Sequence, residues 1–152
     1  MHVEVDQSGK IGQTNVDTVL AFSNGVHFSV LIPRRVKQEC ARRLRTTGLS
    51  AEAIYMRLFA TGLYILLKEH IGKVDRVLID TEYFGKEASI KEHLYNLFRR
   101  SNIQVFRHQV VFGYIGKESS AHKVALDTYR RIRSANRILS ADEILQEFKL
   151  SK

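Results

Sequence analysis

Cysteine and proline are almost absent from this chain of 152 residues, and each scarcity narrows what the protein can be. The single cysteine, Cys40, excludes a disulfide within the chain and is typical of proteins kept in a reducing cytosol. The single proline, Pro33, stands where a strand can end and a helix can begin. We therefore expect a cytoplasmic protein that is long enough to bury a core without covalent cross-links.

Long hydrophobic runs are missing as well. The most apolar stretch, residues 53–67, contains Arg57 and is shorter than the roughly 20 residues that a membrane-spanning helix needs. Glu4 and Asp6 interrupt any apolar run at the start of the chain, so we expect no signal peptide. The content of hydrophobic residues, 44%, and of charged residues, 26%, is ordinary for a globular protein. These features predict one domain over residues 1–152 that does not associate with membranes.

Positive charge outweighs negative charge, and it is unevenly distributed along a chain whose net charge is +8. Six basic residues and one acidic residue lie within 33–46, and a second basic series lies within 123–137. Basic clusters on helices suit a nucleic-acid backbone, because neutralising its phosphates releases counterions. A solvated helix face explains either cluster just as simply. The nucleic-acid-binding residues that we expect are Lys10, Arg34, Arg35, Arg42, Arg43, Arg45, Lys117 and Lys123.

Hydrophobic periodicity and turn residues divide the chain into strands and helices. Asn24-Gly25 is a strong hairpin signal between two β-rich runs. Ser50 can cap a long apolar helix, and Ser140 with Glu143 forms the pattern of a capping box. The expected strands cover residues 2–6, two runs within 18–33, 75–80 and 103–114, the last with an interruption near Arg107-His108. The expected helices cover 34–46, 50–70, 86–100, 119–136 and a short segment after 140. Three antiparallel strands followed by an αβαβα series predict an α/β fold with a five-stranded mixed sheet flanked by helices.

Two of the expected strands end in an aspartate. The stretch "VEVDQSG" places Asp6 before a small-residue turn, and "VLIDTEYFGKE" places Asp80 after a continuous apolar run. Glu82 follows two residues after Asp80 and would share its face of an extended strand. Near the start of the last long helix, "IGKESSAHKVALDTYRR" offers His122 and Asp127. These side chains are the candidates for chemistry.

The order of elements, together with these residues, resembles the ribonuclease H-like superfamily, which includes ribonucleases H, Holliday-junction resolvases, Argonaute nuclease domains and DDE transposases. The order covers nearly the whole chain, whereas the motifs are short. The stretch "DTEYFG" is also similar to the second-aspartate region of some insertion-sequence transposases. The resemblance implies that the first and fourth strands are neighbours, so that Asp6 and Asp80 converge beside the start of the last long helix. It also implies a metal-dependent nuclease that acts on DNA or RNA.

Phosphodiester hydrolysis explains why carboxylates would stand at these positions. Two divalent ions about 4 Å apart activate a water molecule and stabilise charge on the reacting oxygens, and Mg²⁺ or Mn²⁺ prefers carboxylate ligands. The resemblance implies that Asp6 bridges the ions and that Asp80 holds one of them. Glu82 is a further metal ligand if the strand extends far enough to place it on the face of Asp80. His122 and Asp127 lie about 140° apart on a helical wheel, so we do not expect them to bind the same ion. We rank His122, in the first turn, above Asp127 as the remaining catalytic residue.

Simpler interpretations of the same residues stay open. Asp6 before Ser-Gly is typical of a turn that ends a strand, Asp80 can cap the following turn, and His122 can be a helix cap or a surface residue. Two other functions are therefore alternatives to a nuclease. One is a non-catalytic nucleic-acid-binding module on the same fold, and the other is a small partner-binding subunit. The second could form a homodimer through the apolar helix over residues 51–67.

Two further kinds of site lack their signatures. Lys117 follows a glycine, but no Gly-x-x-x-x-Gly-Lys-Ser pattern surrounds it, so we do not expect a phosphate-binding P-loop. Cys40 could form a protease dyad only with a distant histidine, such as His27 or His122, and no local motif supports either pair.

Overall fold

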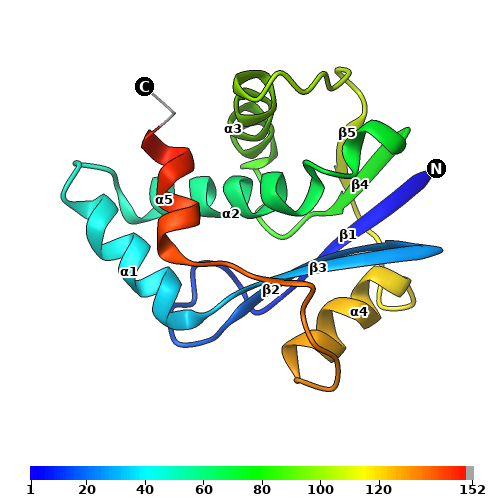
Figure 1. The fold of residues 1–152 in the computed structure, drawn as a ribbon, viewed down its shortest axis with the longest axis horizontal. Coiled ribbons are helices and arrows are strands. Elements are labelled where there is room, and N and C mark those ends of the chain that lie inside the picture. The colour runs from blue at the N-terminus through cyan, green and yellow to red at the C-terminus, as the bar shows by residue number, and fades with distance from the viewer. Residues whose placement is uncertain (150–152) are drawn as a thin grey trace.

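A computed structural model describes residues 1–149 and has the α/β architecture that the sequence predicts (Figure 1). The strands are β1 (His2–Ser8), β2 (Thr18–Asn24), β3 (Val26–Ile32), β4 (Arg76–Asp80), β5 (Val110–Gly113) and β6 (Arg137–Ile138). The helices are α1 (Arg34–Arg45), α2 (Ala51–Leu67), α3 (Glu87–Arg100), α4 (Ser120–Tyr129) and α5 (Ala141–Lys149), with a 3₁₀ turn over Ile71–Lys73.

The described strands form one mixed sheet in the order β5-β4-β1-β2-β3-β6. Strands β1, β2 and β3 are antiparallel, whereas β4 pairs in parallel with β1 and β5 in parallel with β4. Gly25 adopts a φ of +80° in the β2–β3 hairpin, a conformation that glycine reaches without a steric penalty. The prediction of five strands was wrong, because the two-residue β6 pairs with Val30 and Leu31 of β3 but is too short to show alternation.

Two predicted elements are shorter in the structure than the sequence suggested. Strand β5 begins only at Val110, because Gln109 turns inward and its side-chain amide donates to the carbonyl oxygens of Ile71 and Val74. Helix α4 ends at Tyr129 instead of residue 136. Arg131 there takes a φ of +64°, and the following two amides donate to the carbonyl oxygen of Asp127. Both ends are set by hydrogen bonds that a periodic pattern does not reveal.

Helices cover both faces of the central strands. Helices α1, α2, α3 and α5 lie on one side of the sheet and α4 lies on the other (Figure 1). Residues 58–67 of α2 are all buried, and a Cβ atom at Gly62 would lie 2.8 Å from the Leu20 side chain of β2. The apolar surface of α2 is therefore covered within the chain, and it is not the exposed interface that the partner-binding alternative required.

Strand β2 shows how this layering is encoded. Leu20 and Phe22 belong to the main core under α2, whereas Val19 and Ala21 pack with α4 residues on the opposite face. Because alternate residues of a strand face opposite sides, a continuous apolar run is what a strand covered on both faces requires. Among the described helices, none is both long enough and apolar enough to cross a membrane.

Candidate functional site

Three carboxylates meet where the interior strands β1 and β4 run side by side, near the carboxyl end of β4. Strands β1 and β4 are parallel neighbours with Val5 opposite Ile79, so the next residues, Asp6 and Asp80, lie side by side. Glu82 follows just beyond β4. One oxygen atom from each of these three carboxylates lies within 4.8 Å of the others. The structure therefore brings together the three residues that the sequence predicted as metal ligands.

Asp6 is the most buried member of this acidic cluster, with a side chain only 5% exposed. Its Oδ1 atom accepts a hydrogen bond of 2.8 Å from the amide of Gln7, and its Oδ2 atom lies 2.7 Å from Nδ1 of His122. Burial raises the pKa of Asp6 above its usual value, although the hydrogen bonds from Gln7 and His122 oppose this effect. A carboxylate in such a position is stabilised by a nearby positive charge.

Glu82 shows most clearly that the acidic cluster concentrates negative charge. Burial, followed by the charges of Asp80 and Asp6, raises its pKa to about 7, and Lys10 acts in the opposite direction. Asp80 is held in place because its Oδ1 atom accepts a hydrogen bond of 3.1 Å from the amide of Ile115. Carboxylates at such separations repel one another, and a divalent cation between them would remove the repulsion. The donor set therefore fits Mg²⁺ or Mn²⁺.

The turns around the acidic cluster are anchored by side chains that the sequence analysis did not single out. The Tyr83 hydroxyl donates to Oε1 of Gln7 and accepts from the amide of Ile11, and its ring packs edge-on against Phe59. Gly9 takes a φ of +76°, and a Cβ atom there would lie 2.0 Å from the carbonyl oxygen of Asp17. The only signal for Tyr83 in the sequence is its position directly after Glu82.

The two residues proposed on the last long helix differ in their placement. His122 lies in the first turn of α4 and contacts Asp6, while Ser119, which caps this helix, donates to Oε1 of Glu4 at 2.6 Å. Asp127 is not a member of the acidic cluster, because it lies more than one turn further along α4. The preference for His122 therefore agrees with the geometry, and the catalytic assignment of Asp127 does not.

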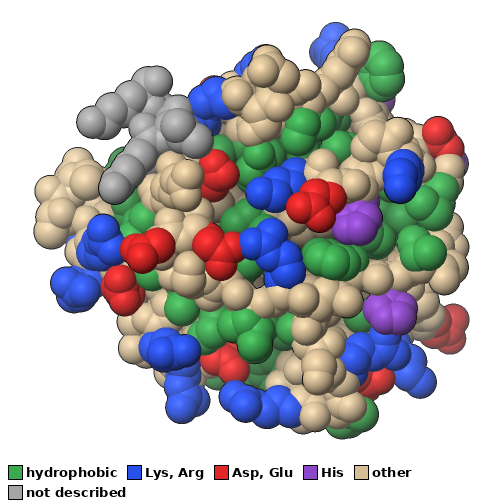
Figure 2. All heavy atoms as spheres, viewed as in Figure 1, with side chains coloured by type: hydrophobic (Ala, Val, Ile, Leu, Met, Phe, Trp, Pro, Cys, Tyr) green, Lys and Arg blue, Asp and Glu red, His purple; other side chains and the backbone are tan. Residues whose placement is uncertain are grey.

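The basic residues predicted to bind nucleic acid fall into two groups. Lys10, Lys117 and Lys123 are exposed on segments that adjoin the acidic cluster: Lys10 follows β1 and acts on the pKa of Glu82, Lys117 lies in the loop before α4, and Lys123 follows His122. The second group is exposed on α1 and comprises Arg34, Arg35, Arg42, Arg43 and Arg45. On the face shown in Figure 2, basic side chains gather along the left and lower margins with acidic side chains among them.

Lys37 belongs to the same basic run in the sequence but not to the surface. Its side chain is fully buried, and Nζ donates to the carbonyl oxygens of Lys10 and Gln13 and to Oγ1 of Thr18 at 2.7–3.2 Å. Burial lowers its pKa to about 8. Lys37 thus ties α1 to the loop after β1, and five of the six basic residues within 33–46 remain for the exposed surface of α1.

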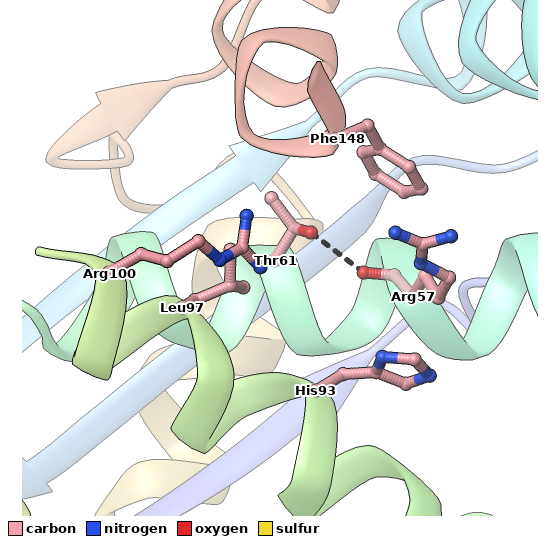
Figure 3. Close-up of a pocket in the computed structure, with 6 residues that line it drawn as sticks. All are labelled: Arg57, Thr61, His93, Leu97, Arg100 and Phe148. Carbon is pink, nitrogen blue, oxygen red and sulfur yellow. Dashed lines mark hydrogen bonds between the residues drawn. The ribbon is translucent and has the colours of Figure 1, made fainter. Parts of the chain in front are cut away.

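A pocket between α2, α3 and α5 is lined by the basic side chains of Arg57, His93 and Arg100 (Figure 3). The Arg57 guanidinium lies 4.8 Å from the centre of the Phe148 ring, and Thr61 donates to the carbonyl oxygen of Arg57. Arg100 donates to the carbonyl oxygen of Glu147. Arg57 of α2 and Arg100 of α3 both contact residues of α5, so these side chains attach α5 to the two longer helices.

Comparison of the chain with protein-family models, with curated proteins and with solved structures finds no match. The functional interpretation therefore depends on the acidic cluster and on its place in the sheet. Three features of that place are the neighbouring positions of Asp6 and Asp80 on two parallel strands, the helix start that supplies His122, and the exposed lysines on the adjoining segments.

Proposed function

We propose that this protein is a divalent-metal-dependent nuclease that hydrolyses phosphodiester bonds in nucleic acid. One observation carries the proposal: oxygen atoms of Asp6 on β1, of Asp80 at the end of the parallel neighbour β4 and of Glu82 just beyond it lie within 4.8 Å of one another. Hard cations such as Mg²⁺ and Mn²⁺ prefer oxygen ligands of this kind. When bound, such ions supply an activated water molecule and stabilise charge on the attacking and leaving oxygens.

The sheet order supports a ribonuclease H-like arrangement for this site. Omitting β6, the spatial order of the strands is β5-β4-β1-β2-β3. Along the chain, three antiparallel strands come first, and β4 and β5 then join the sheet in parallel beside β1. Asp6 on the central strand, Asp80 on its parallel neighbour and a helix that reaches back to Asp6 are the features that the sequence resemblance implied.

The contacts of each residue indicate its role at the proposed metal site. Asp6 is the central ligand, held by the amide of Gln7 and by His122. Asp80 and Glu82 complete the ligand set from the β4 side. His122 uses Nδ1 to orient Asp6, and Nε2 of the same ring is the atom that would exchange a proton with substrate or water.

A cleavage assay with matched variants tests the proposal. Wild-type protein with Mn²⁺ is offered single-stranded, duplex, hybrid and branched nucleic acids, and we expect it to cut at least one of them. Asp6→Asn should abolish cleavage but leave binding intact or slightly tighter, because the amide removes negative charge and weakens ion coordination. Asp127→Asn is the matched control and should cleave like the wild type. Equal cleavage by Asp6→Asn would assign the activity to another site or to a contaminant.

A non-catalytic nucleic-acid-binding module is the second candidate, and the contact between Asp6 and His122 favours it. A protonated imidazole there would neutralise part of the negative charge without a metal ion. Calorimetric titration with Mn²⁺ separates the two functions. Binding that is lost in Asp80→Asn supports the nuclease, whereas a protein that binds nucleic acids but neither Mn²⁺ nor cleavable substrate is the binding module.

A further inference from the structure

The two most exposed large hydrophobic side chains of the described structure both flank the acidic cluster. Phe84 is 81% exposed and follows Glu82 by two residues, and Tyr114 is 87% exposed. Tyr114 lies between Gly113, whose carbonyl oxygen accepts from the amide of Thr81, and Ile115, whose amide donates to Asp80. The Tyr114 segment is therefore hydrogen-bonded to Asp80 and its neighbour Thr81, and Phe84 stands two residues after Glu82.

Neighbouring residues fix the backbone from which each ring projects. Tyr83, next to Phe84, is fixed by its contacts with Gln7 and Ile11, and Gly85 turns the chain directly afterwards with a φ of +79°. A Cβ atom at Gly116 would lie 3.3 Å from the ring of Tyr114, so that ring packs over a position without a side chain. Both rings nevertheless leave most of their apolar surface in water, and a flat apolar partner would bury it.

The surroundings of the rings indicate the chemistry of that partner. Lys10 is exposed in the turn after β1, which carries Asp6, Lys117 is exposed in the loop between Tyr114 and the start of α4, and Lys123 is exposed one residue after His122. Exposed aromatic rings among basic side chains are the combination that binds unpaired nucleic acid, because bases stack on the rings while phosphates contact the basic groups. In a continuous duplex the faces of the bases are covered by their neighbours and cannot stack on a side chain.

We propose that Phe84 and Tyr114 stack on unpaired bases on either side of the phosphate held at the acidic cluster. The substrate is therefore single-stranded or locally unpaired nucleic acid, not a continuous duplex. This inference rests on the proposed function for the phosphate between the two bases. The stacking itself needs neither metal nor cleavage, so the two proposals can fail separately.

The sequence contains no tryptophan, so one substitution creates a single fluorescent reporter. We expect the emission of Phe84→Trp and of Tyr114→Trp to be quenched by a short single-stranded oligonucleotide in EDTA, and much less by a duplex of equal length. Phe106→Trp is the matched control, because Phe106 is 68% exposed in the loop before the opposite end of β5. Equal quenching of all three reporters, equal quenching by duplex, or no quenching would overturn the inference.

Alanine variants measure the contribution of each ring. Phe84→Ala and Tyr114→Ala should each weaken single-strand binding roughly 5- to 150-fold, which is the usual loss for one stacked base, while Phe106→Ala should not. Mn²⁺ binding and thermal unfolding should match the wild type in all three. Efficient duplex cleavage without quenching would refute the stacking and leave the nuclease standing, whereas quenching without any cleavage would do the reverse. A shift of Phe84→Trp emission with protein concentration alone would show that the ring covers a second copy, and would also refute it.

Discussion

Lys37 and Asp6 are both charged and both buried, yet the protein holds them in different ways. Lys37 donates to three oxygen atoms, so its ammonium group has a protein acceptor for each of its protons. Asp6 has one amide and one imidazole, and two further carboxylates stand beside it. The hydrogen bonds of the lysine are complete, although burial still lowers its pKa, whereas the aspartate has two groups of its own charge beside it. This contrast separates a structural charge from a candidate site.

Replacing Lys37 should reduce stability. In Lys37→Met the carbonyl oxygens of Lys10 and Gln13 and the hydroxyl of Thr18 lose their donor, and unsatisfied buried polar groups typically cost about 1–3 kcal/mol. Arg42→Met, on the exposed face of the same helix, is the control and should change the free energy of unfolding by less than about 0.5 kcal/mol. Urea denaturation of both variants measures the difference. Similar values for the two would show that Lys37 does not support the fold.

The difference in stability between the wild type and Lys37→Met should depend on pH. The pKa of Lys37 is about 8 in the folded protein and 10.5 is its reference value, so between these values the unfolded state binds more protons. Stability conferred by position 37 therefore rises as the pH increases through this window. We expect the wild type to gain stability relative to Lys37→Met from pH 8 to pH 10.5. A constant difference would mean that the lysine titrates alike in both states.

His122 is the third residue whose role can be separated by substitution. His122→Ala removes the group that orients Asp6, and it also removes a possible proton acceptor. If the imidazole is a general base, the rate of cleavage should fall by about 10²–10⁴-fold without vanishing, since general-base catalysis typically contributes this much. Single-turnover cleavage at saturating Mn²⁺ measures the effect. A rate equal to that of Asp6→Asn would instead make His122 indispensable to the ligand set.

At the residue scale, the members of the acidic cluster could be predicted from the sequence, but the buried side chains that hold the surrounding segments could not. Asp6 lies on β1 and Asp80 ends β4, and the parallel pairing of these strands places the two side by side, so their meeting follows from strand order. The expectation that the first strand ends at Asp6 was wrong, because β1 continues to Ser8 in its pairing with β2. Lys37 looked like its basic neighbours because the sequence does not show the oxygen atoms that surround it. Phe84 and Tyr83 are adjacent and both aromatic, and only the fold places one inside and the other in solvent.

At the scale of elements, local signals located helix starts better than strand ends. The capping box formed by Ser140 and Glu143 appears as predicted: each side chain accepts a hydrogen bond from the backbone amide of the other. Strand β6 was missed because two residues carry no periodicity, and its position depends on pairing with β3 far earlier in the chain. Caps are local, whereas the ends of β5 and α4 depend on partners from elsewhere.

The capping box offers a direct test of how α5 is held. Ser140→Ala removes the acceptor for the amide of Glu143, and loss of such a cap typically costs about 1 kcal/mol. Ser134→Ala, at an exposed position in the preceding segment, is the control and should be nearly neutral. Chemical denaturation monitored by circular dichroism gives both values. An equal loss in the two variants would show that the cap contributes nothing beyond the general effect of a serine deletion.

At the scale of the whole molecule, a net charge of +8 attracts any polyanion, so total charge must be distinguished from the position of charge. Two triple variants do this, because each lowers the net charge to +5. One replaces the lysines near the acidic cluster by alanine, namely Lys10, Lys117 and Lys123. The other replaces arginines of α1, namely Arg42, Arg43 and Arg45. If binding depended only on total charge, the two variants would behave identically.

We expect the lysine variant to lose more affinity for single strands than the arginine variant. Its residues stand on segments that adjoin the acidic cluster, whereas Arg43 on α1 already contacts Glu39 and Asp142. For three phosphate contacts, the slope of log affinity against log salt should fall by about 2, because each contact on a single strand contributes roughly 0.7. Fluorescence anisotropy at several salt concentrations measures both slopes. An unchanged slope in the arginine variant would remove α1 from the nucleic-acid surface, and an unchanged slope in the lysine variant would remove the acidic cluster from it.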